Sequence, residues 1–257
     1  MTDGHPDQDG AASADDAPVR PAATVVVLRD AVHAGSAGLE VLMLRRNSKL
    51  AFYGGAWVFP GGRIDPEDCL DGDRLDHIGA AVRAGVRETF EEAGLTLPVA
   101  ELVHFAQWLT PPGRTRRFDT WFFAARAARG QGVGPRASGI QVDQGEIDAH
   151  RWLSPAAALA AHGRGEIELP PPTFVTLSQL KPFVSAESAY DSLAQGAVQR
   201  FAPRPIQTEE TLVFLYEEDA GYPERNPHAE GPRHRITVRG HQWHYEQPER
   251  TEDPTRS

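Results

Sequence analysis

The stretch Arg87-Glu88-Thr89-Phe90-Glu91-Glu92-Ala93-Gly94-Leu95 decides how the rest of the chain is interpreted. It ends a segment, from about residue 76 to 93, in which apolar residues recur every four positions, namely Ile78, Val82, Val86 and Phe90. Residues with this spacing lie on one side of a helix, so a helix is predicted here. Gly94 is expected to end it, because glycine readily takes the left-handed conformation that follows a last helical turn.

Three glutamates of this helix share one side of it. Glu88, Glu91 and Glu92 fall within an arc of about 100° at the normal helical rotation per residue. Carboxylates this close repel one another unless a cation neutralises them, and hard oxygen ligands suit Mg²⁺ or Mn²⁺. Because glutamate-rich helix faces are often merely solvated, the neighbouring residues matter. Arg87 can orient a glutamate, and Gly85 permits a close backbone approach, which we expect to involve residues 59–62.

The segments around the helix predict a mixed α/β order of strands. Short apolar runs are expected to form strands at residues 24–28, 39–44, 57–59, 102–109, 118–125 and 146–153. The turn Pro111-Pro112-Gly113 separates two of them. Ser154-Pro155 is expected to begin a second helix, with serine as the N-cap and proline in the first turn.

The chain divides into four predicted parts. Residues 1–20 are rich in Asp, Gly, Ala and Ser and are predicted to be disordered, with order beginning near residue 23. Residues 21–168 form the predicted α/β domain. Residues 169–247 follow a break at Pro170-Pro171-Pro172 and form a predicted appendage of helices and a hairpin, whose turn is at Arg239-Gly240. We expect this appendage to act in dimer formation or in substrate binding. Residues 248–257 are a flexible tail.

Composition narrows the class of protein. Among 257 residues, 40% are hydrophobic and 24% charged, which is ordinary for a globular protein. The net charge of -10 disfavours nucleic acid and anionic membranes as partners. A single cysteine, Cys69, excludes an intramolecular disulfide and fits a reducing compartment. No apolar run approaches the roughly 20 residues of a membrane span, and the acidic N-terminus is unlike a signal peptide. A cytoplasmic location is expected.

The run from Arg87 to Leu95 resembles the second half of the Nudix box, whose pattern ends R-E-U-x-E-E-x-G-U. Thr89 departs mildly from it, at a position that is usually aliphatic. The run Trp57-Val58-Phe59-Pro60-Gly61-Gly62 is similar to the usual entry into the box. The resemblance covers about residues 22–165. It implies an α/β/α sandwich with a mixed sheet, here followed by an α+β appendage.

The resemblance implies a hydrolase that cleaves a pyrophosphate bond in a small phosphorylated substrate. Glu88, Glu91 and Glu92 would bind Mg²⁺ or Mn²⁺, which makes phosphoryl oxygens more electrophilic and bound water more acidic. Arg87 belongs to the same catalytic set, and Glu92 or Glu88 would act as the base.

Glu146 is the other candidate for the base. It lies six residues before Trp152, at a loop-to-strand position where many Nudix enzymes place a catalytic or metal-binding glutamate. A solvated residue at a strand start is the alternative. Asp148 is a weaker candidate.

The box is longer than usual. Its arginine normally follows its glycine by 14 positions, whereas Arg87 follows Gly62 by 25, so 11 extra residues are present. The position of the first box glutamate falls on Gly79, and either Glu67 or Asp68 is expected to supply a carboxylate near the loop.

An insertion at this point resembles the coenzyme A and acyl-coenzyme A diphosphatases of the peroxisomal mammalian type and their bacterial relatives. Similar runs occur at residues 110–112, 117–123 and 169–174. The resemblance implies a coenzyme A-like substrate. ADP-ribose or a dinucleotide stays an alternative, as does a Nudix-fold binding module without catalysis.

Several arginines are candidates for binding substrate phosphate. Arg114, Arg116 and Arg117 form a basic group after the turn at residues 111–113, suited to the 3′-phosphate of coenzyme A. Arg45 and Arg46 follow a predicted strand and are given the same role. A solvated loop is the alternative for each group.

Overall fold

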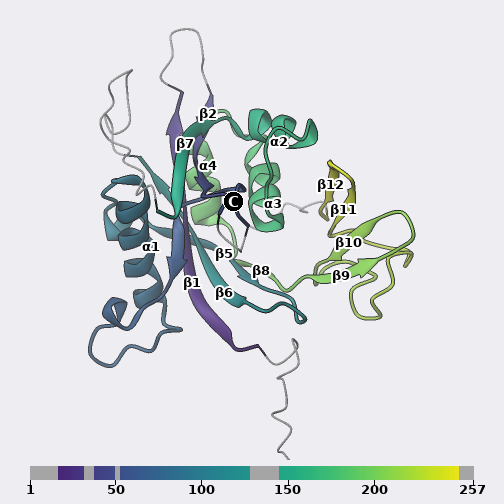
Figure 1. Ribbon diagram of the computed structural model, residues 1–257, viewed down its shortest axis with the longest axis horizontal. Coiled ribbons are helices and arrows are strands. Elements are labelled where there is room, and N and C mark those ends of the chain that lie inside the picture. Colours follow the sequence, from purple (N-terminus) through teal and green to yellow (C-terminus); the bar gives the residue numbers. More distant parts are fainter. Residues whose placement is uncertain (1–16, 32–37, 50–52, 128–144, 249–257) are drawn as a thin grey trace, which may run out of the picture.

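A computed structural model describes residues 17–31, 38–49, 53–127 and 145–248. A mixed sheet lies between α1 on one face and α2, α3 and α4 on the other (Figure 1). The expected α/β/α sandwich is therefore confirmed. Of the predicted disordered segment, residues 1–20, residues 1–16 lie outside the described ranges, but the prediction is wrong for Val19 and Arg20, which are part of a strand. Of the predicted tail, residues 248–257, residues 249–257 lie outside the described ranges.

The main sheet has eight strands in the order β3-β2-β1-β6-β5-β8, with β4 paired to β1 and β7 paired to β2. Its strands are β1 (Val19–Asp30), β2 (Leu39–Arg46), β3 (Trp57–Val58), β4 (Gly61–Arg63), β5 (Val103–Leu109), β6 (Arg117–Arg126), β7 (Ile147–Leu153) and β8 (Gln199–Phe201). Strand β1 begins at Val19, five residues before the expected start at residue 24, because Val19 to Ala22 pair in parallel with the first residues of β6.

Helix α1 (Ile78–Ala93) follows a 3-10 turn at Pro66–Asp68 and ends at Gly94, whose φ of 65° is the expected left-handed cap. Two of the four periodic apolar residues that predicted the helix are largely exposed. Ile78 is 44% exposed and Phe90 is 58% exposed. The face on the sheet is made instead of smaller residues with one glutamate, namely Ala80, Ala81, Ala84, Gly85, Thr89, Glu92 and Ala93.

Small residues are needed there because the helix lies close to the sheet. A Cβ on Gly85 would stand 2.9 Å from Cγ2 of Val25, so this glycine faces β1 and not residues 59–62 as expected. Thr89 is fully buried, and its hydroxyl donates to the Gly85 carbonyl at 2.7 Å, which explains how a polar residue is tolerated at this position.

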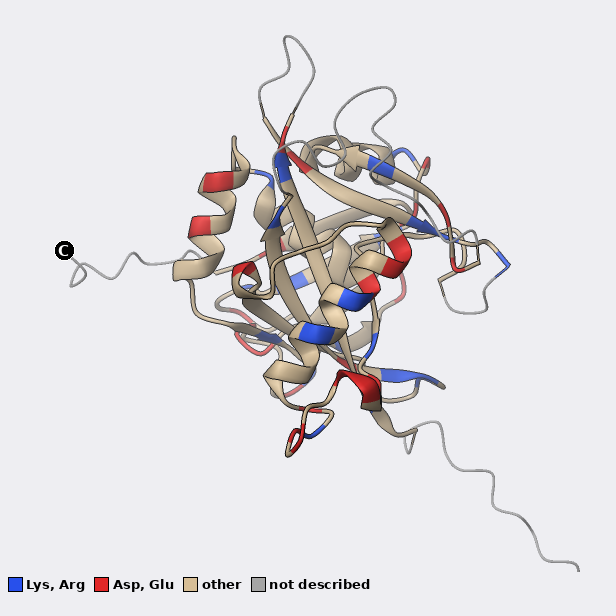
Figure 2. Ribbon diagram, turned by 90° about the vertical axis from the view of Figure 1, so that its left-hand side faces the viewer, with Lys and Arg blue, Asp and Glu red and all other residues tan. Residues whose placement is uncertain are grey.

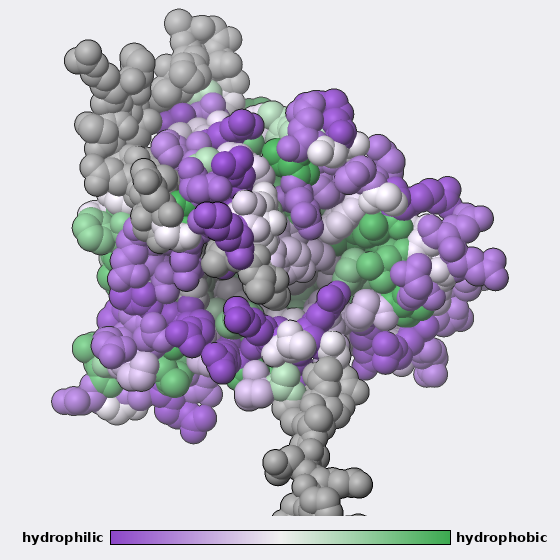
Figure 3. Space-filling model, viewed as in Figure 1, coloured by the Kyte–Doolittle hydropathy of each residue, from purple (hydrophilic) through white to green (hydrophobic). Residues whose placement is uncertain are grey.

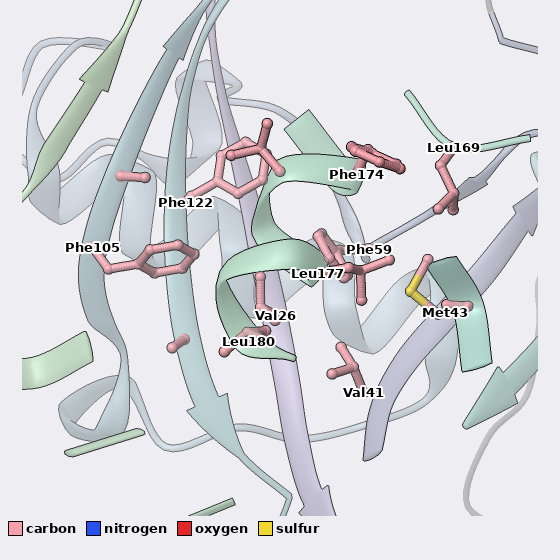
Figure 4. Packing of buried hydrophobic residues seen from close by; sticks show 14 of the residues in the cluster. Val26, Val41, Met43, Phe59, Phe105, Phe122, Leu169, Phe174, Leu177 and Leu180 are labelled. Atoms are coloured by element: carbon pink, nitrogen blue, oxygen red, sulfur yellow. The ribbon is translucent and has the colours of Figure 1, made fainter. Parts of the chain in front are cut away.

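The second face of the sheet carries the larger hydrophobic cluster. Alternate residues of β1 and β2 point to it, and Figure 4 shows Val26, Val41 and Met43 beside Leu177 and Leu180 of a helix. The helices on this face are α2 (Pro155–Gly163), α3 (Pro171–Leu180) and α4 (Ala186–Gln195). Ser154 caps α2 as expected, accepting from the Ala157 N–H at 3.2 Å.

A second, four-stranded sheet follows in the order β12-β11-β10-β9. Its antiparallel strands are β9 (Arg204–Gln207), β10 (Leu212–Leu215), β11 (Arg235–Arg239) and β12 (Gln242–Glu246), and the last two form the expected hairpin. Hydrophobic residues gather on this side of the molecule in Figure 3. The sheet is joined to the core through aromatic rings: Trp108 of β5 stacks on Phe201 at 4.0 Å and meets Tyr216 edge-on at 5.7 Å.

None of the described helices has the length and apolar character that a membrane crossing requires.

Candidate active site

The acidic end of α1 lies beside the loop that enters strand β4. Acidic residues follow basic ones along this helix in Figure 2. Glu92 is only 5% exposed, and its Oε2 accepts a hydrogen bond from the Gly61 N–H at 2.9 Å. A Cβ on Gly62 would overlap the Glu88 carboxylate, so glycine is required where the loop passes this side chain. The two predicted motif segments therefore form one site.

Arg87 connects the acidic groups around it. Its guanidinium donates to both Asp68 oxygens, at 2.8 and 3.0 Å, to Glu88 Oε1 at 2.9 Å and to Glu91 Oε2 at 3.2 Å. It also donates to the carbonyl of Arg63 at 3.1 Å. The planar, two-pronged pairing with Asp68 fixes the plane of the guanidinium. Arg87 thereby sets the position of two of the three predicted metal ligands.

Asp68 is the carboxylate that the lengthened box supplies. Its side chain is 4% exposed, whereas the neighbouring Glu67 is exposed, so only one of the two candidates faces the site. Burial alone raises the pKa of Asp68, but the hydrogen bonds from Arg87 and the Asp65 N–H and the charges of Arg87 and Arg83 more than offset it and hold the pKa below its usual value. Asp68 is therefore the charged partner of Arg87.

The rest of the inserted segment is tied to the same helix. Nε of Arg83, one turn before Arg87, donates to the Asp68 carbonyl at 2.5 Å, and the Arg83 guanidinium pairs with Asp73. The insertion therefore packs against α1 at two successive turns.

Glu88 and Glu92 lie in an environment that disfavours two bare negative charges. Burial raises the pKa of Glu92 to about 8, with a further upward contribution from Glu88 and Glu146. The Gly61 N–H and the charge of Arg46 oppose the rise. Burial also raises the pKa of Glu88, against the lowering effect of Arg87. Glu146, an exposed residue directly before β7, thus acts electrostatically on both glutamates.

Residues 18–171 match the model of the NUDIX domain family. The chain belongs to the Nudix family. Its relatives include an acyl-coenzyme A diphosphatase, NUDT19, of Xenopus laevis, which is 23% identical over 72% of this chain and 72% of that protein. The m7GpppN-mRNA hydrolase NUDT17 of Bos taurus is 32% identical, but over 49% of this chain and 41% of that protein.

A solved Nudix structure supports the assignment. The NUDIX hydrolase from Alicyclobacillus acidocaldarius superposes with a TM-score of 0.58 at 26% identity, covering 71% of this chain and 100% of that one. The chain is accordingly a Nudix hydrolase, and Nudix enzymes generally use divalent metal cations.

The donor set of this Nudix hydrolase fits such a cation. Glu88 and Glu92 offer hard oxygen atoms, and their pKa values are raised mainly by burial and further by the charges of neighbouring glutamates, which a cation would offset. Within the described ranges, no group of three His, Cys, Asp or Glu side chains already stands in a metal-binding arrangement. The Glu88 and Glu91 carboxylates accept from Arg87, and that of Glu92 accepts from the Gly61 N–H.

The predicted phosphate-binding arginines are spread over separate places. Arg45, at the end of β2, donates to Asp148 of β7 at 2.6 Å. Arg117 donates to the Thr110 carbonyl at 3.4 Å and so helps to form its own turn. Arg114 is exposed at that turn, near enough to Tyr53 for its charge to lower the pKa of the tyrosine, which burial raises.

A cavity of about 640 Å³ beside Arg45 was not foreseen from the sequence. Its walls come from the ends of β2 and β7, from β3, from residues 162–168 and from the hairpin of the second sheet. No local pattern marks it, because these segments are far apart along the chain. Its lining includes the aromatic side chains Trp57 and Trp243.

Proposed function

We propose that this Nudix hydrolase cleaves the diphosphate of coenzyme A or acyl-coenzyme A with the help of Mg²⁺ or Mn²⁺. The proposal rests mainly on the lengthened box, whose extra residues place the Asp68 carboxylate beside the Arg87 guanidinium. The relative named acyl-coenzyme A diphosphatase matches over most of both chains, whereas the mRNA hydrolase matches about half of this one. A net charge of -10 also disfavours an RNA substrate.

In this proposal Glu88, Glu91 and Glu92 hold the cation, and Arg87 keeps two of them in place. A bound divalent cation supplies positive charge that polarises the phosphoryl oxygens and offsets the charge of the carboxylates. The reaction then depends mainly on positioning and on charge neutralisation.

The water that attacks phosphorus must lose a proton to a base. Glu92 and Glu88 are buried carboxylates with raised pKa values, and such groups accept protons more readily than exposed ones. Glu146 is the alternative base, because its charge reaches both glutamates from the start of β7. Comparing kcat against pH for Glu146→Gln and Glu92→Gln separates them: the variant that loses the acidic limb, where the rate rises as the base is deprotonated, identifies the base.

A substrate panel tests the proposed activity. Coenzyme A, acetyl-coenzyme A, ADP-ribose and a diadenosine polyphosphate are incubated with the protein and Mg²⁺ or Mn²⁺, and mass spectrometry identifies the products. Coenzyme A should give 3′-phosphoadenosine 5′-phosphate and 4′-phosphopantetheine, and EDTA should abolish the reaction. Equal or higher kcat/KM on ADP-ribose would overturn the proposed substrate, and turnover that survives EDTA would overturn the role of the cation.

A further inference from the structure

The cavity of about 640 Å³ lies between the Nudix core and the hairpin β11–β12. Figure 1 shows this hairpin beside α2 and α3. The core contributes Arg45, Trp57, Asp148, His162 and Glu168, and the hairpin contributes Val238, Gly240, His241 and Trp243. The volume is within the range of roughly 300–1,000 Å³ typical of small-molecule sites.

The hairpin wall is held in place by specific contacts. Gln242 donates to the Gly163 carbonyl at the end of α2, at 3.1 Å. The Trp243 ring lies edge-on to His162 at 4.8 Å and tilted to Phe174 at 5.2 Å. The cavity is therefore a formed feature of the fold, with aromatic surface on the side of the second sheet.

His162 forms part of the cavity wall and is itself a buried residue. The residue is 3% exposed, and its Nδ1 lies 3.3 Å from the Ile167 carbonyl. Because a carbonyl can only accept, Nδ1 carries the proton of the neutral ring, which leaves Nε2 as an acceptor. Nε2 has no hydrogen-bond partner among the described residues. Nε2 is also shielded from solvent, so His162 contributes ring surface to the cavity wall and does not present this acceptor to a ligand.

The charges of the lining select against phosphate. Asp148, Glu166 and Glu168 all line the cavity, and Arg45 is the one Lys or Arg among the described lining residues. Arg45 is already paired with Asp148 at 2.6 Å. A phosphate would meet net negative charge here, whereas N–H and O–H donors would meet acceptors. The site suits a neutral group with several donors and some apolar surface.

The cavity begins next to the proposed reaction centre. Trp57 of its lining lies four residues before Gly61, whose N–H donates to Glu92 at 2.9 Å, and five residues before Gly62, which passes directly against the Glu88 carboxylate. A substrate with its diphosphate at these glutamates therefore needs to extend only past the ends of β2 and β7 to reach it.

We propose that this cavity holds the uncharged arm of the substrate, so that the C-terminal hairpin selects which group attached to the diphosphate is accepted. This inference rests on the proposed function, under which the arm is pantetheine with any attached acyl group. The pantetheine arm has two amide N–H groups and one free hydroxyl, which can donate to the Glu168 carboxylate of the lining. Its methyl and methylene groups match Val238 and Trp243. The nucleotide half, with its 3′-phosphate, binds outside the cavity.

A variant that fills the cavity tests the assignment in the full-length protein. Val238→Trp places a large ring in the lining, and Arg239→Ala is the matched control, because Arg239 is the next residue of β11 and pairs with Glu210 on the exposed side. Isothermal titration calorimetry measures binding of 4′-phosphopantetheine and of 3′-phosphoadenosine 5′-phosphate. Val238→Trp should weaken the first by tenfold or more and leave the second within twofold, and Arg239→Ala should change neither.

A second variant covers failure of Val238→Trp to fold, which circular dichroism would reveal. Glu168→Ala removes an exposed carboxylate of the lining and should weaken binding of 4′-phosphopantetheine by threefold or more without affecting the nucleotide. If both ligands weaken equally in either variant, or neither does, the cavity assignment is wrong. If the wild-type protein does not cleave coenzyme A, the proposed function fails. Cleavage with unchanged 4′-phosphopantetheine affinity overturns the cavity assignment alone.

Discussion

Glu92 is almost completely buried and accepts a hydrogen bond from the Gly61 N–H. A glutamine at this position has nearly the same shape without the charge, so the effect of the charge can be measured alone. Glu92→Gln keeps an oxygen for the Gly61 N–H but removes the negative charge. We expect kcat to fall by about 10²-fold or more, the scale reported for loss of a key electrostatic group, with an unchanged circular dichroism spectrum. Glu67→Ala is the control, because Glu67 is exposed on the inserted segment. Near-normal kcat in Glu92→Gln would refute the role given to this glutamate.

Asp68 acts on the site through Arg87, so it is a positioning residue. Asp68→Ala removes the two-pronged partner of Arg87 and lets the guanidinium turn toward Glu88 and Glu91. Loss of such an outer partner typically costs about 10–100-fold in activity or metal affinity. We expect the Mg²⁺ concentration for half-maximal rate to rise in proportion, with partial rescue in Asp68→Glu. A fall in kcat at saturating Mg²⁺ with an unchanged half-maximal Mg²⁺ concentration would contradict this role.

At the level of the elements, α1 depends on how closely it approaches β1. A valine at Gly85 would clash with Val25, since even a Cβ would stand 2.9 Å from its Cγ2. Overpacking of this kind costs about 1–3 kcal/mol, and urea unfolding of Gly85→Val should show a loss of that size. Gly163→Ala is the control, because a Cβ there would meet nothing within 4 Å. If Gly85→Val and the wild type had the same free energy of unfolding, α1 would be able to move away from β1 without loss of stability.

The periodic pattern of large apolar residues predicted helix α1 correctly, but these residues are not the ones that form its buried face. Ile78 and Phe90 are the larger apolar residues, and a hydrophobic pattern gives weight to size, yet both are substantially exposed. The close approach at Gly85 admits only small residues, so alanines face the sheet. The glutamate positions were predictable because they depend on the helical rotation alone. The carboxylate near the loop was predicted only as either Glu67 or Asp68. The inserted segment between this pair and Arg87 has no regular pattern from which the contact could be derived.

The second sheet is stabilised by one buried ion pair. Arg235 donates to both oxygens of Asp219, at 2.6 and 2.5 Å, and the two side chains are 6% and 0% exposed. Asp219→Asn leaves Arg235 as a poorly compensated buried charge, which costs about 3–5 kcal/mol. The exposed pair formed by Arg239 and Glu210 in the same sheet is the control, and its removal should have no measurable effect on unfolding.

The pH dependence of this pair has a definite sign. Burial alone raises the pKa of Asp219, but hydrogen bonds from Arg235, His234 and Gly221 outweigh it and lower the pKa. The contribution to stability is therefore complete above the unfolded pKa of about 3.9 and is lost as the pH falls toward the lower folded value. The difference in the free energy of unfolding between wild type and Asp219→Asn should shrink below about pH 4. A constant difference down to pH 2 would contradict this assignment.

Across the whole molecule, sequence reasoning succeeded where one segment carries the chemistry and failed where several segments meet. The mixed α/β order follows from local periodicity, and the family and the α/β/α layers follow from resemblance to one motif; all were predicted. The cavity depends on the packing of a hairpin near the C-terminus against residues 162–168 of the core, which no local pattern records. Arg117 has a side chain suited to binding phosphate, but in the fold it donates to the Thr110 carbonyl.

Cation binding should be visible in the stability of the entire fold, because the carboxylates of α1 contact the loop before β4 and act on the region before β7. A cation that binds only the folded protein stabilises it by about 2.7 kcal/mol at 100 times its Kd. For a chain of this size that corresponds to roughly 5–10 °C in Tm. Differential scanning calorimetry should therefore show Tm rising with millimolar Mn²⁺ in the wild type and in Glu67→Ala, but far less in Glu92→Gln. An equal rise in Glu92→Gln would place the stabilising cation elsewhere on this acidic protein, and kcat measured in the same Mn²⁺ series would show whether that other cation takes any part in the reaction.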